Sequence, residues 1–225
     1  MLRDYCKYLV TLAGAKMSQP RLNQIQTFAN QLHIGAWARQ RHYTFAERKR
    51  DRTQVWSEMV SRIEGRKVLY LEFGVAAGDS IRWWAQALKD PQATLHGFDS
   101  FEGLPEQNGP WFKGQFDAQG RAPALNDQRV TFFKGWFDQV LPTYTPPAHD
   151  LLVVNMDADL YSSTIFVLRW LRPLLKPGTL IYFDEMDHVD HEPRAIDEFT
   201  TETGWCLRPL AADWTLAHSS FEFVK

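Results

Sequence analysis

Short apolar runs alternate with longer amphipathic segments through the second two-thirds of the chain. The apolar runs span residues 68–73, 94–98, 130–133, 151–156 and 180–183. Buried runs of this length between helices are typical of a parallel sheet that is covered by helices on both faces. Residues 205–210 and 215–224 predict a final hairpin, which brings the expected sheet to about seven strands.

The N-terminal region has the periodicity of helices instead. Apolar side chains recur at i, i+3, i+4 and i+7 in two stretches, namely Ile25, Phe28, Ala29 and Leu32, and then Trp56, Met59, Val60 and Ile63. A looser connection is expected between them, around Gly35, Trp37, His42, Tyr43 and Phe45. Further helices are predicted over residues 80–88 and 164–175. We therefore expect one domain over residues 1–225, with a helical cap (1–65) that packs against an α/β core (66–225).

Composition and charge exclude several broad classes of protein. Of the 225 residues, 44% are hydrophobic and 23% are charged, and the formal net charge is -2. Nucleic-acid binding requires clustered positive charge, and the one basic stretch, residues 39–52, is interpreted as a solvated helix face. No run approaches the ~18 apolar residues of a membrane span. Cys6 and Cys206 have no metal-ligand spacing, as expected of reduced thiols in a cytoplasmic protein.

A glycine-containing turn follows the apolar run at 68–73. Residues 72–80 read EFGVAAGDS, and Gly74 and Gly78 allow the backbone to turn tightly and to approach a ligand. The next helix presents free N–H groups to the same place. The spacing is neither the dinucleotide G-x-G-x-x-G nor a phosphate-binding P-loop. With Glu72 two residues before Gly74, the turn suits a ligand with a positively charged end; a plain strand–turn–helix is the alternative.

Acidic residues stand at the ends of the next predicted strands. In open α/β sheets ligands bind beyond the carboxyl ends of the strands, where Asp99 is placed to accept both hydroxyls of a ribose. The alternative is that Asp99 caps the turn before Glu102.

Four further carboxylates, those of Asp157, Asp159, Asp184 and Glu185, follow the runs at 151–156 and 180–183. If these strands are neighbours, their ends lie about 4.8 Å apart. Such crowding requires a cation or bound protons, and hard oxygen ligands suit magnesium. An ion there would hold substrate hydroxyls and leave one carboxylate as a base. In the alternative, Asp159 caps the following helix and the acids after residue 183 are solvated.

Together these segments resemble the macrocin O-methyltransferase family, which includes sugar O-methyltransferases of antibiotic pathways. The matching stretches are 71–80 (LEFGVAAGDS), 97–106 (GFDSFEGLPE), 130–142 (VTFFKGWFDQVLP), 157–164 (DADLYSST), 177–185 (PGTLIYFDE) and 191–199 (HEPRAIDEF). They cover most of residues 68–200 in the family's order. The strings GFDSFEGLP and DADLYSST are the most specific of them.

The resemblance implies a Rossmann-like class I methyltransferase sheet, S-adenosylmethionine as methyl donor and a hydroxyl group as acceptor. It places Glu72, Gly74, Gly78 and Ser80 around the methionine part of the donor, Asp99, Ser100 and Phe101 near the ribose, and Gly135 and Trp136 beside the adenine, with Asp157 also in the donor site. It also implies a Mg²⁺ ion bound by Asp157, Asp184 and Glu185, with Asp159 as general base. The sugar enzymes usually carry Asp-Asp where this chain has Asp184-Glu185, and the longer glutamate changes the geometry available to an ion.

The remaining expectations concern the acceptor and partners. Residues 105–126 form a loop long enough to be functional, and it is expected to fold over the donor or to line the acceptor pocket. His188 and His191 are interpreted as surface residues. The partner is expected to be a small hydroxylated molecule, a sugar or another natural product, and the aromatic N-terminal helices are a candidate homodimer contact. A binding protein without turnover and a metal-dependent hydrolase stay open as alternatives.

Overall fold

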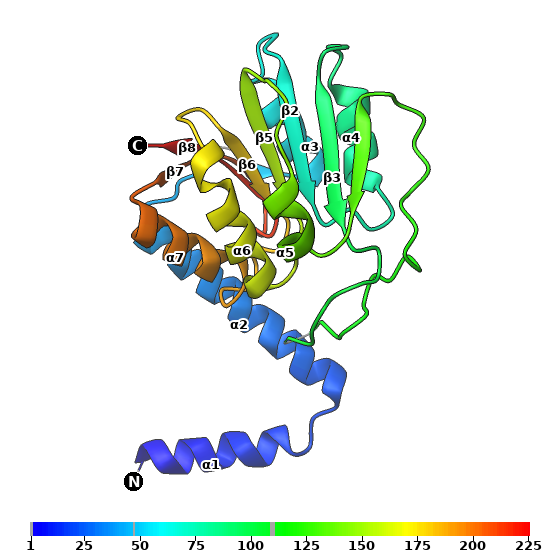
Figure 1. The fold of residues 1–225 in the computed structure, drawn as a ribbon. Coiled ribbons are helices and arrows are strands. Elements are labelled where there is room, and N and C mark those ends of the chain that lie inside the picture. Colours follow the sequence, from blue (N-terminus) through cyan, green and yellow to red (C-terminus); the bar gives the residue numbers. More distant parts are fainter. Residues whose placement is uncertain (1, 47, 109–110) are drawn as a thin grey trace.

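A mostly parallel sheet forms the centre of the molecule (Figure 1). The computed structural model describes residues 2–46, 48–108 and 111–225. Within these residues the sheet has eight strands in the order β1-β7-β8-β6-β5-β2-β3-β4, and β8 runs antiparallel to both of its neighbours. The strands are β1 (Arg48–Lys49), β2 (Val68–Phe73), β3 (Thr94–Asp99), β4 (Val130–Lys134), β5 (Leu151–Met156), β6 (Leu180–Phe183), β7 (Cys206–Asp213) and β8 (Ser219–Val224).

The seven predicted strands are confirmed, and β1 is an addition to them. The strands β2, β5 and β6 have the predicted bounds, while β3 and β4 extend one residue further. The predicted hairpin is formed by β7 and β8. No pattern in the sequence predicted β1, because this strand of two residues exists only through its parallel pairing with β7.

The two faces of the sheet bury separate clusters of apolar side chains. Because successive side chains of a strand point to opposite faces, β2 contributes Leu69, Leu71 and Phe73 to one cluster and Val68 and Tyr70 to the other. The helices are α1 (Leu2–Gly14), α2 (Gln19–Gln40), α3 (Arg52–Val60), α4 (Asp79–Ala87), α5 (Phe137–Val140), α6 (Tyr161–Leu171) and α7 (Glu192–Thr203), with 3₁₀ turns at Leu141–Thr143 and Arg172–Leu174. The end of α2 with α6 and α7 covers the first face, and α3 and α4 cover the second.

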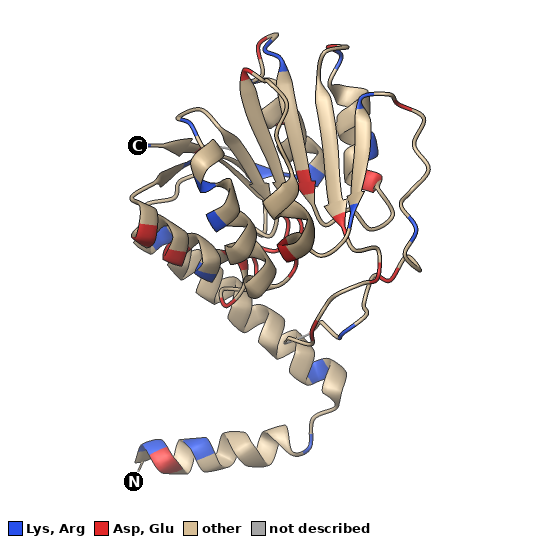
Figure 2. Cartoon of the chain, in the orientation of Figure 1, with Lys and Arg blue, Asp and Glu red and all other residues tan. Residues whose placement is uncertain are grey.

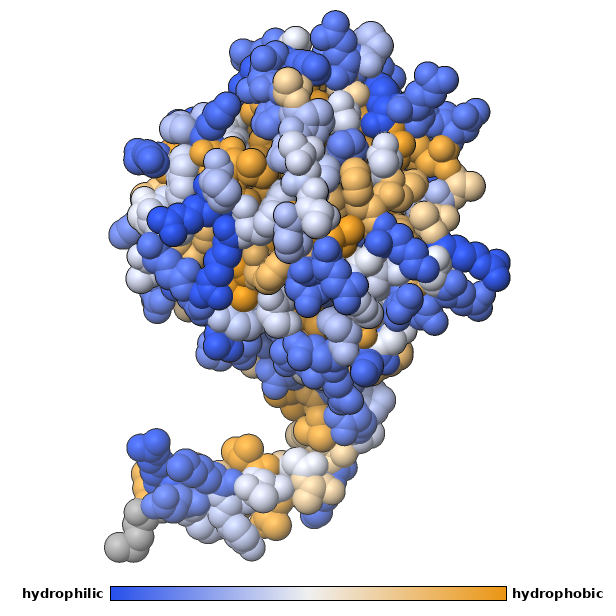
Figure 3. Space-filling model, viewed as in Figure 1, coloured by the Kyte–Doolittle hydropathy of each residue, from blue (hydrophilic) through white to orange (hydrophobic). Residues whose placement is uncertain are grey.

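The N-terminal cap differs from its prediction. The apolar stripe of α2 does not pack against the sheet: Ile25, Phe28 and Leu32 are 53%, 73% and 77% exposed. Only the last turns of α2 are buried, through Ile34 and Trp37. Gly35 and Trp37 therefore lie within the helix and not in a connection. The prediction was wrong because periodicity identifies the apolar face of a helix but not what covers that face. The helix α1 buries no residue and projects from the body with apolar side chains exposed (Figure 3).

Among the described residues, no helix is long and apolar enough to span a membrane. Both cysteines are free, with Cys6 on α1 and Cys206 at the start of β7. The interpretation of residues 39–52 as a solvated helix face is wrong. Arg41 pairs with Asp197 of α7, while the guanidinium of Arg48 lies over the ring of Phe45.

A pH dependence of stability follows from His96 on β3. Its Nδ1 lies 2.6 Å from the hydroxyl of Tyr144, and burial lowers the pKa of His96 to about 4. Since an unfolded histidine titrates near ~6.5, the unfolded chain gains a proton first as the pH falls, and the native state loses stability between about pH 6.5 and 4. We expect the loss to be about 1–2 kcal/mol after allowance for partial exposure of the ring.

Denaturant unfolding at several pH values tests this expectation. His96→Gln should lose stability less steeply than the unaltered chain over that window, because its side chain gains no proton in either state. His33→Gln, on the exposed surface of α2, is the matched control and should leave the slope unchanged. Identical slopes for His96→Gln and the unaltered chain would contradict the assignment.

Candidate active site

A cavity of about 540 Å³ lies beyond the carboxyl ends of the central strands. The strand order changes direction between β2 and β5, and open α/β sheets bind ligands at such a switch point. Acidic residues gather around these strand ends (Figure 2). The predicted site residues that line the cavity are Gly74, Asp99, Ser100, Gly135, Trp136, Asp157, Asp159, Asp184 and Glu185.

The turn after β2 is held close to the end of β5. Gly74 has φ +89°, and a Cβ built on it would lie 1.8 Å from the carbonyl oxygen of Asp157. No residue other than glycine fits there without displacing one of the two segments. Gly78 (φ +79°) is the N-cap residue of α4 and lies outside the cavity lining, and a Cβ built on it would lie 2.7 Å from the side chain of Pro123. The two glycines thus shape the turn, and Gly74 also forms part of the cavity wall.

Glu72 lies behind the turn and not on the cavity surface. It is fully buried, where the hydroxyl groups of Ser80 (2.6 Å) and Tyr70 donate hydrogen bonds to its two carboxylate oxygens. Burial raises the pKa of Glu72 to about 8, although both hydrogen bonds act in the opposite direction. In this structure Glu72 and Ser80 therefore fix the start of α4 relative to β2. Phe101, also predicted at the donor site, is buried in the core outside the lining.

Asp99 serves the turn as well as the cavity. One of its carboxylate oxygens accepts hydrogen bonds from the N–H groups of Val75 (2.7 Å) and Ala76 (2.8 Å), and the other accepts one from Phe101 (2.7 Å). The alternative in which Asp99 caps its own turn is thus partly realised. A carboxylate has about four acceptor positions, so acceptor capacity remains on the side that faces the cavity.

The acids after β5 and β6 raise one another's pKa values. Burial and the charge of Asp184 raise the pKa of Asp157 well above its usual value and that of Glu185 to about 9. Asp184 behaves oppositely: burial acts to raise its pKa, but hydrogen bonds from His218 and Tyr182 lower it overall. Asp184 therefore keeps its charge more readily than Asp157 and Glu185, whose ionisation it opposes.

This arrangement does not support the predicted magnesium site. Among the residues that the structure describes, no three or more His, Cys, Asp or Glu side chains are arranged to hold a metal ion. Asp184 is instead engaged by Tyr182, by His218 (Nδ1–Oδ1 3.2 Å) and by Arg52 (3.7 Å). The crowding of the carboxylates led us to expect an ion from the sequence. In the structure, the neutral and cationic side chains around Asp184 reduce this repulsion instead.

Asp159 stands in an uncommon backbone conformation inside the cavity. Its φ is +56°, a left-handed value that is uncommon for residues other than glycine, and its side chain is buried. It does not cap α6, since the residue before that helix is Leu160 and no side chain caps it. Burial and the charge of Asp184 raise the pKa of Asp159 to about 7, against a hydrogen bond from Trp111 that lowers it.

The long loop at 105–126 borders the site, as predicted. Trp111 is buried against the rings of His188 and His191, at centroid distances of 4.8 and 4.6 Å. Glu106 accepts a hydrogen bond from Ser162 of α6 (2.6 Å), and Phe116 lines the cavity. The interpretation of His191 as a surface residue is wrong, because the loop covers it to 4% exposure.

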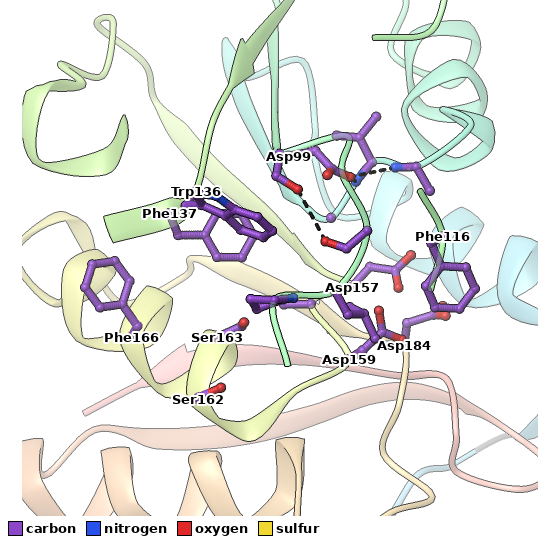
Figure 4. A pocket seen from close by; sticks show the side chains of 18 of the residues that line it. Asp99, Phe116, Trp136, Phe137, Asp157, Asp159, Ser162, Ser163, Phe166 and Asp184 are labelled. Carbon is purple, nitrogen blue, oxygen red and sulfur yellow. Dashed lines mark hydrogen bonds between the residues drawn. The ribbon is translucent and has the colours of Figure 1, made fainter. Parts of the chain in front are cut away.

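The opposite side of the cavity is aromatic. Figure 4 shows Trp136 and Phe137 on one side and Asp157, Asp159 and Asp184 on the other. The aromatic side follows β4, where Gly135 has φ +147° and its N–H donates to the carbonyl oxygen of Asp99 (2.9 Å). An apolar wall of this kind suits a flat heterocycle.

Several residues of the lining were not predicted from the sequence. These are Arg52 at the start of α3, Leu104 and Pro105 at the beginning of the long loop, Asp138 of α5, and Ser162, Ser163 and Phe166 of α6. A signal existed for the two serines, which follow the D-x-D string at the start of a helix. None existed for Arg52, because the position of α3 depends on packing against distant segments.

The fold is that of the Rossmann-like class I methyltransferases. The crystal structure of CalS11, a calicheamicin methyltransferase, superposes with a TM-score of 0.58 and 23% identity over 76% of this chain and 78% of that one. The O-methyltransferase NovP superposes with a TM-score of 0.56 and 23% identity over 75% and 78%. At this identity the likeness establishes the fold alone.

A family model described as a methyltransferase domain matches residues 71–186, and the chain belongs to that family. A tetracenomycin-C rhamnosyl 4'-O-methyltransferase of Streptomyces olivaceus is 33% identical over 121 residues, which is 49% of this chain and 44% of that protein. Mycinamicin III 3''-O-methyltransferase of Micromonospora griseorubida is 32% identical over 96 residues, 43% of this chain and 35% of that protein. The chain thus spans less than half of these relatives, and the narrower resemblance to macrocin O-methyltransferases stays a prediction.

Proposed function

We propose that the chain is an S-adenosylmethionine-dependent O-methyltransferase that acts on a hydroxyl of a small molecule, of the sugar or natural-product class. The observation that carries the proposal is that the turn after β2, Asp99 at the end of β3 and Asp159 after β5 face one cavity of about 540 Å³. Cavities of ~300–1,000 Å³ are the usual size for small ligands and cofactors. The sugar O-methyltransferases among the relatives support the choice of acceptor.

The donor is proposed to lie across the strand ends. Its methionine part lies over the bend at Gly74, its ribose near Asp99 and Ser100, and its adenine against the wall that contains Gly135 and Trp136. The remaining predicted donor residues, Glu72, Gly78, Ser80 and Phe101, act by holding the turns in place. The free N–H groups at the start of α4 lie next to the same turn.

The reaction requires alignment and removal of one proton. The sulfonium makes the methyl carbon electrophilic, so an acceptor oxygen held in line with the S–CH₃ bond gains up to ~7–11 kcal/mol from orientation. The oxygen bonds to the methyl carbon, the C–S bond breaks with its electron pair passing to sulfur, and the hydroxyl proton passes to the carboxylate of Asp159. A base that titrates close to the working pH suits this role. No step is assigned to a metal ion, because the carboxylates of Asp157, Asp184 and Glu185 are not arranged as one metal site.

The acceptor is proposed to bind between α6 and the loop that includes Trp111 and Phe116. Apolar rings with a few polar groups, here Ser162 and Ser163, are typical of sites for sugars and other hydroxylated molecules. The hydrogen bond between Ser162 and Glu106 joins the loop to α6 across this part of the cavity.

Trp111→Phe tests the role of the loop in catalysis. The phenyl ring keeps the packing against the two histidines but loses the N–H that bonds Asp159. We expect kcat to fall about tenfold, the value of one hydrogen bond to a charged group, with the affinity for S-adenosylhomocysteine unchanged. Steady-state kinetics with calorimetry measures both, and Phe112→Leu, on the exposed part of the loop, is the control. An unchanged kcat would remove Trp111 from the mechanism.

The function itself is tested by turnover. Donor with a labelled methyl group is incubated with the protein and a panel of glycosides and hydroxylated natural products, and the label is followed into product. We expect O-methylation of at least one sugar-bearing compound. Conversion of a panel member without donor would favour a hydrolase, and donor binding without transfer to any member would favour a binding protein.

A further inference from the structure

Arg52 differs in charge from the other side chains that line the cavity. It is the first residue of α3, outside the segment that the family model matches. Among the lining residues that the structure describes, it alone is cationic. The acidic lining residues are Asp99, Asp138, Asp157, Asp159, Asp184 and Glu185.

The start of α3 is held firmly beside this edge of the sheet. Asp51 caps the helix by accepting hydrogen bonds from the N–H groups of Thr53 (3.0 Å) and Gln54 (3.2 Å). One turn later Trp56 is buried against Tyr182 of β6, at a ring-centroid distance of 5.6 Å. The backbone of Arg52 is therefore fixed relative to the carboxyl end of β6.

The guanidinium of Arg52 retains most of its hydrogen-bonding capacity. Its central carbon lies 5.3 Å from the ring centroid of Trp56, so the ring orients the group without using its N–H donors. Its Nη1 lies 3.7 Å from the nearer carboxylate oxygen of Asp184, which is within ion-pair range but too far for a hydrogen bond. The side chain is 39% exposed, so a ligand in the cavity can reach it.

The proposed methyl donor carries a carboxylate that is complementary in charge to the guanidinium of Arg52. This step rests on the function proposed above, which places the methionine portion over Gly74. That portion carries an ammonium and a carboxylate, and the lining acids attract the first and repel the second. We propose that Arg52 binds the α-carboxylate of the methionine portion of S-adenosylmethionine, so that the ammonium turns toward the acids and the sulfonium faces the acceptor. The planar guanidinium suits this role, because it binds a carboxylate through two parallel hydrogen bonds.

Three ligands that differ stepwise in the amino-acid tail test this assignment by calorimetry. They are S-adenosylhomocysteine, its decarboxylated analogue with a 3-aminopropyl tail, and 5'-methylthioadenosine, which has no tail. The variants are Arg52→Gln and Arg52→Lys, with Arg50→Gln as the control at an exposed neighbouring position. We expect Arg52→Gln to weaken S-adenosylhomocysteine about tenfold to hundredfold and to change the other two less than about threefold. Arg52→Lys should restore part of the affinity, and Arg50→Gln should bind all three like the unaltered chain.

Two results would overturn the assignment. Equal weakening of all three ligands by Arg52→Gln would show that Arg52 acts only by offsetting the charge of Asp184. Unchanged binding of S-adenosylhomocysteine would show that the carboxylate binds elsewhere. Both results leave the proposed function in place, whereas failure of the unaltered chain to bind any of the three would overturn that function together with this assignment.

Discussion

Asp159→Asn is expected to lower kcat by about 10²–10⁴ while the protein still binds S-adenosylhomocysteine normally. The amide has the shape of the carboxylate but cannot accept the proton of the acceptor hydroxyl, and the loss of a positioned general base has an effect of this size. Steady-state kinetics with the acceptor from the substrate panel gives kcat, and calorimetry gives the affinity for the donor product.

The control for Asp159→Asn is Asp190→Asn. Asp190 is exposed and lies in the segment between β6 and α7, so this change also removes one negative charge near the cavity. We expect it to leave kcat within about twofold, since an exposed charge has little effect on a buried group. Undiminished turnover of Asp159→Asn over a pH series would exclude this residue as the base.

Gly74→Ala is expected to abolish measurable donor binding and to lower stability by several kcal/mol. The new Cβ would lie 1.8 Å from the carbonyl oxygen of Asp157, so the turn and the end of β5 must separate. Backbone shifts in a packed region typically cost ~1–3 kcal/mol, and the left-handed φ of +89° adds ~1–2 kcal/mol for a residue with a Cβ.

Gly114→Ala is a closely matched control for Gly74→Ala. Gly114 has φ +80°, but a Cβ there meets nothing within 4 Å. This variant therefore measures the cost of the backbone conformation alone, about 1–2 kcal/mol, and should bind S-adenosylhomocysteine normally. Equal stability losses and equal donor affinities for the two variants would show that the close approach of Gly74 to β5 has no role in the site.

The strands and the acidic edge of the sheet could be predicted from the sequence, because both depend on local pattern. A parallel strand buried on both faces is a short apolar run, and its carboxyl end is the residue after that run, as Asp99 and Asp157 show. Convergence of these ends then follows from the geometry of parallel sheets. The cavity lining at β2, β3, β5 and β6 follows from the same rule.

The parts that could not be predicted depend on partners distant in sequence. The apolar stripe of α2 gives no indication that Phe28 stays exposed, and nothing near Arg52 in the sequence shows that α3 brings it to the cavity. Similarly, the sequence does not show that His218 pairs with Asp184, because the two residues lie far apart in the chain. Without that pairing, the cluster of acids suggested a bound ion. Glu72 was expected at the ligand, but its hydrogen bond with Ser80 places it behind the turn.

Calorimetric titration of the unaltered chain with S-adenosylhomocysteine tests whether an adenosyl amino acid binds at the strand ends, which the proposed donor site, the general base and the role of Arg52 all require. We expect one site per chain, saturable binding in the micromolar range or tighter, and a rise in unfolding temperature with ligand concentration. No heat of binding and no shift of the unfolding temperature at millimolar ligand would contradict it.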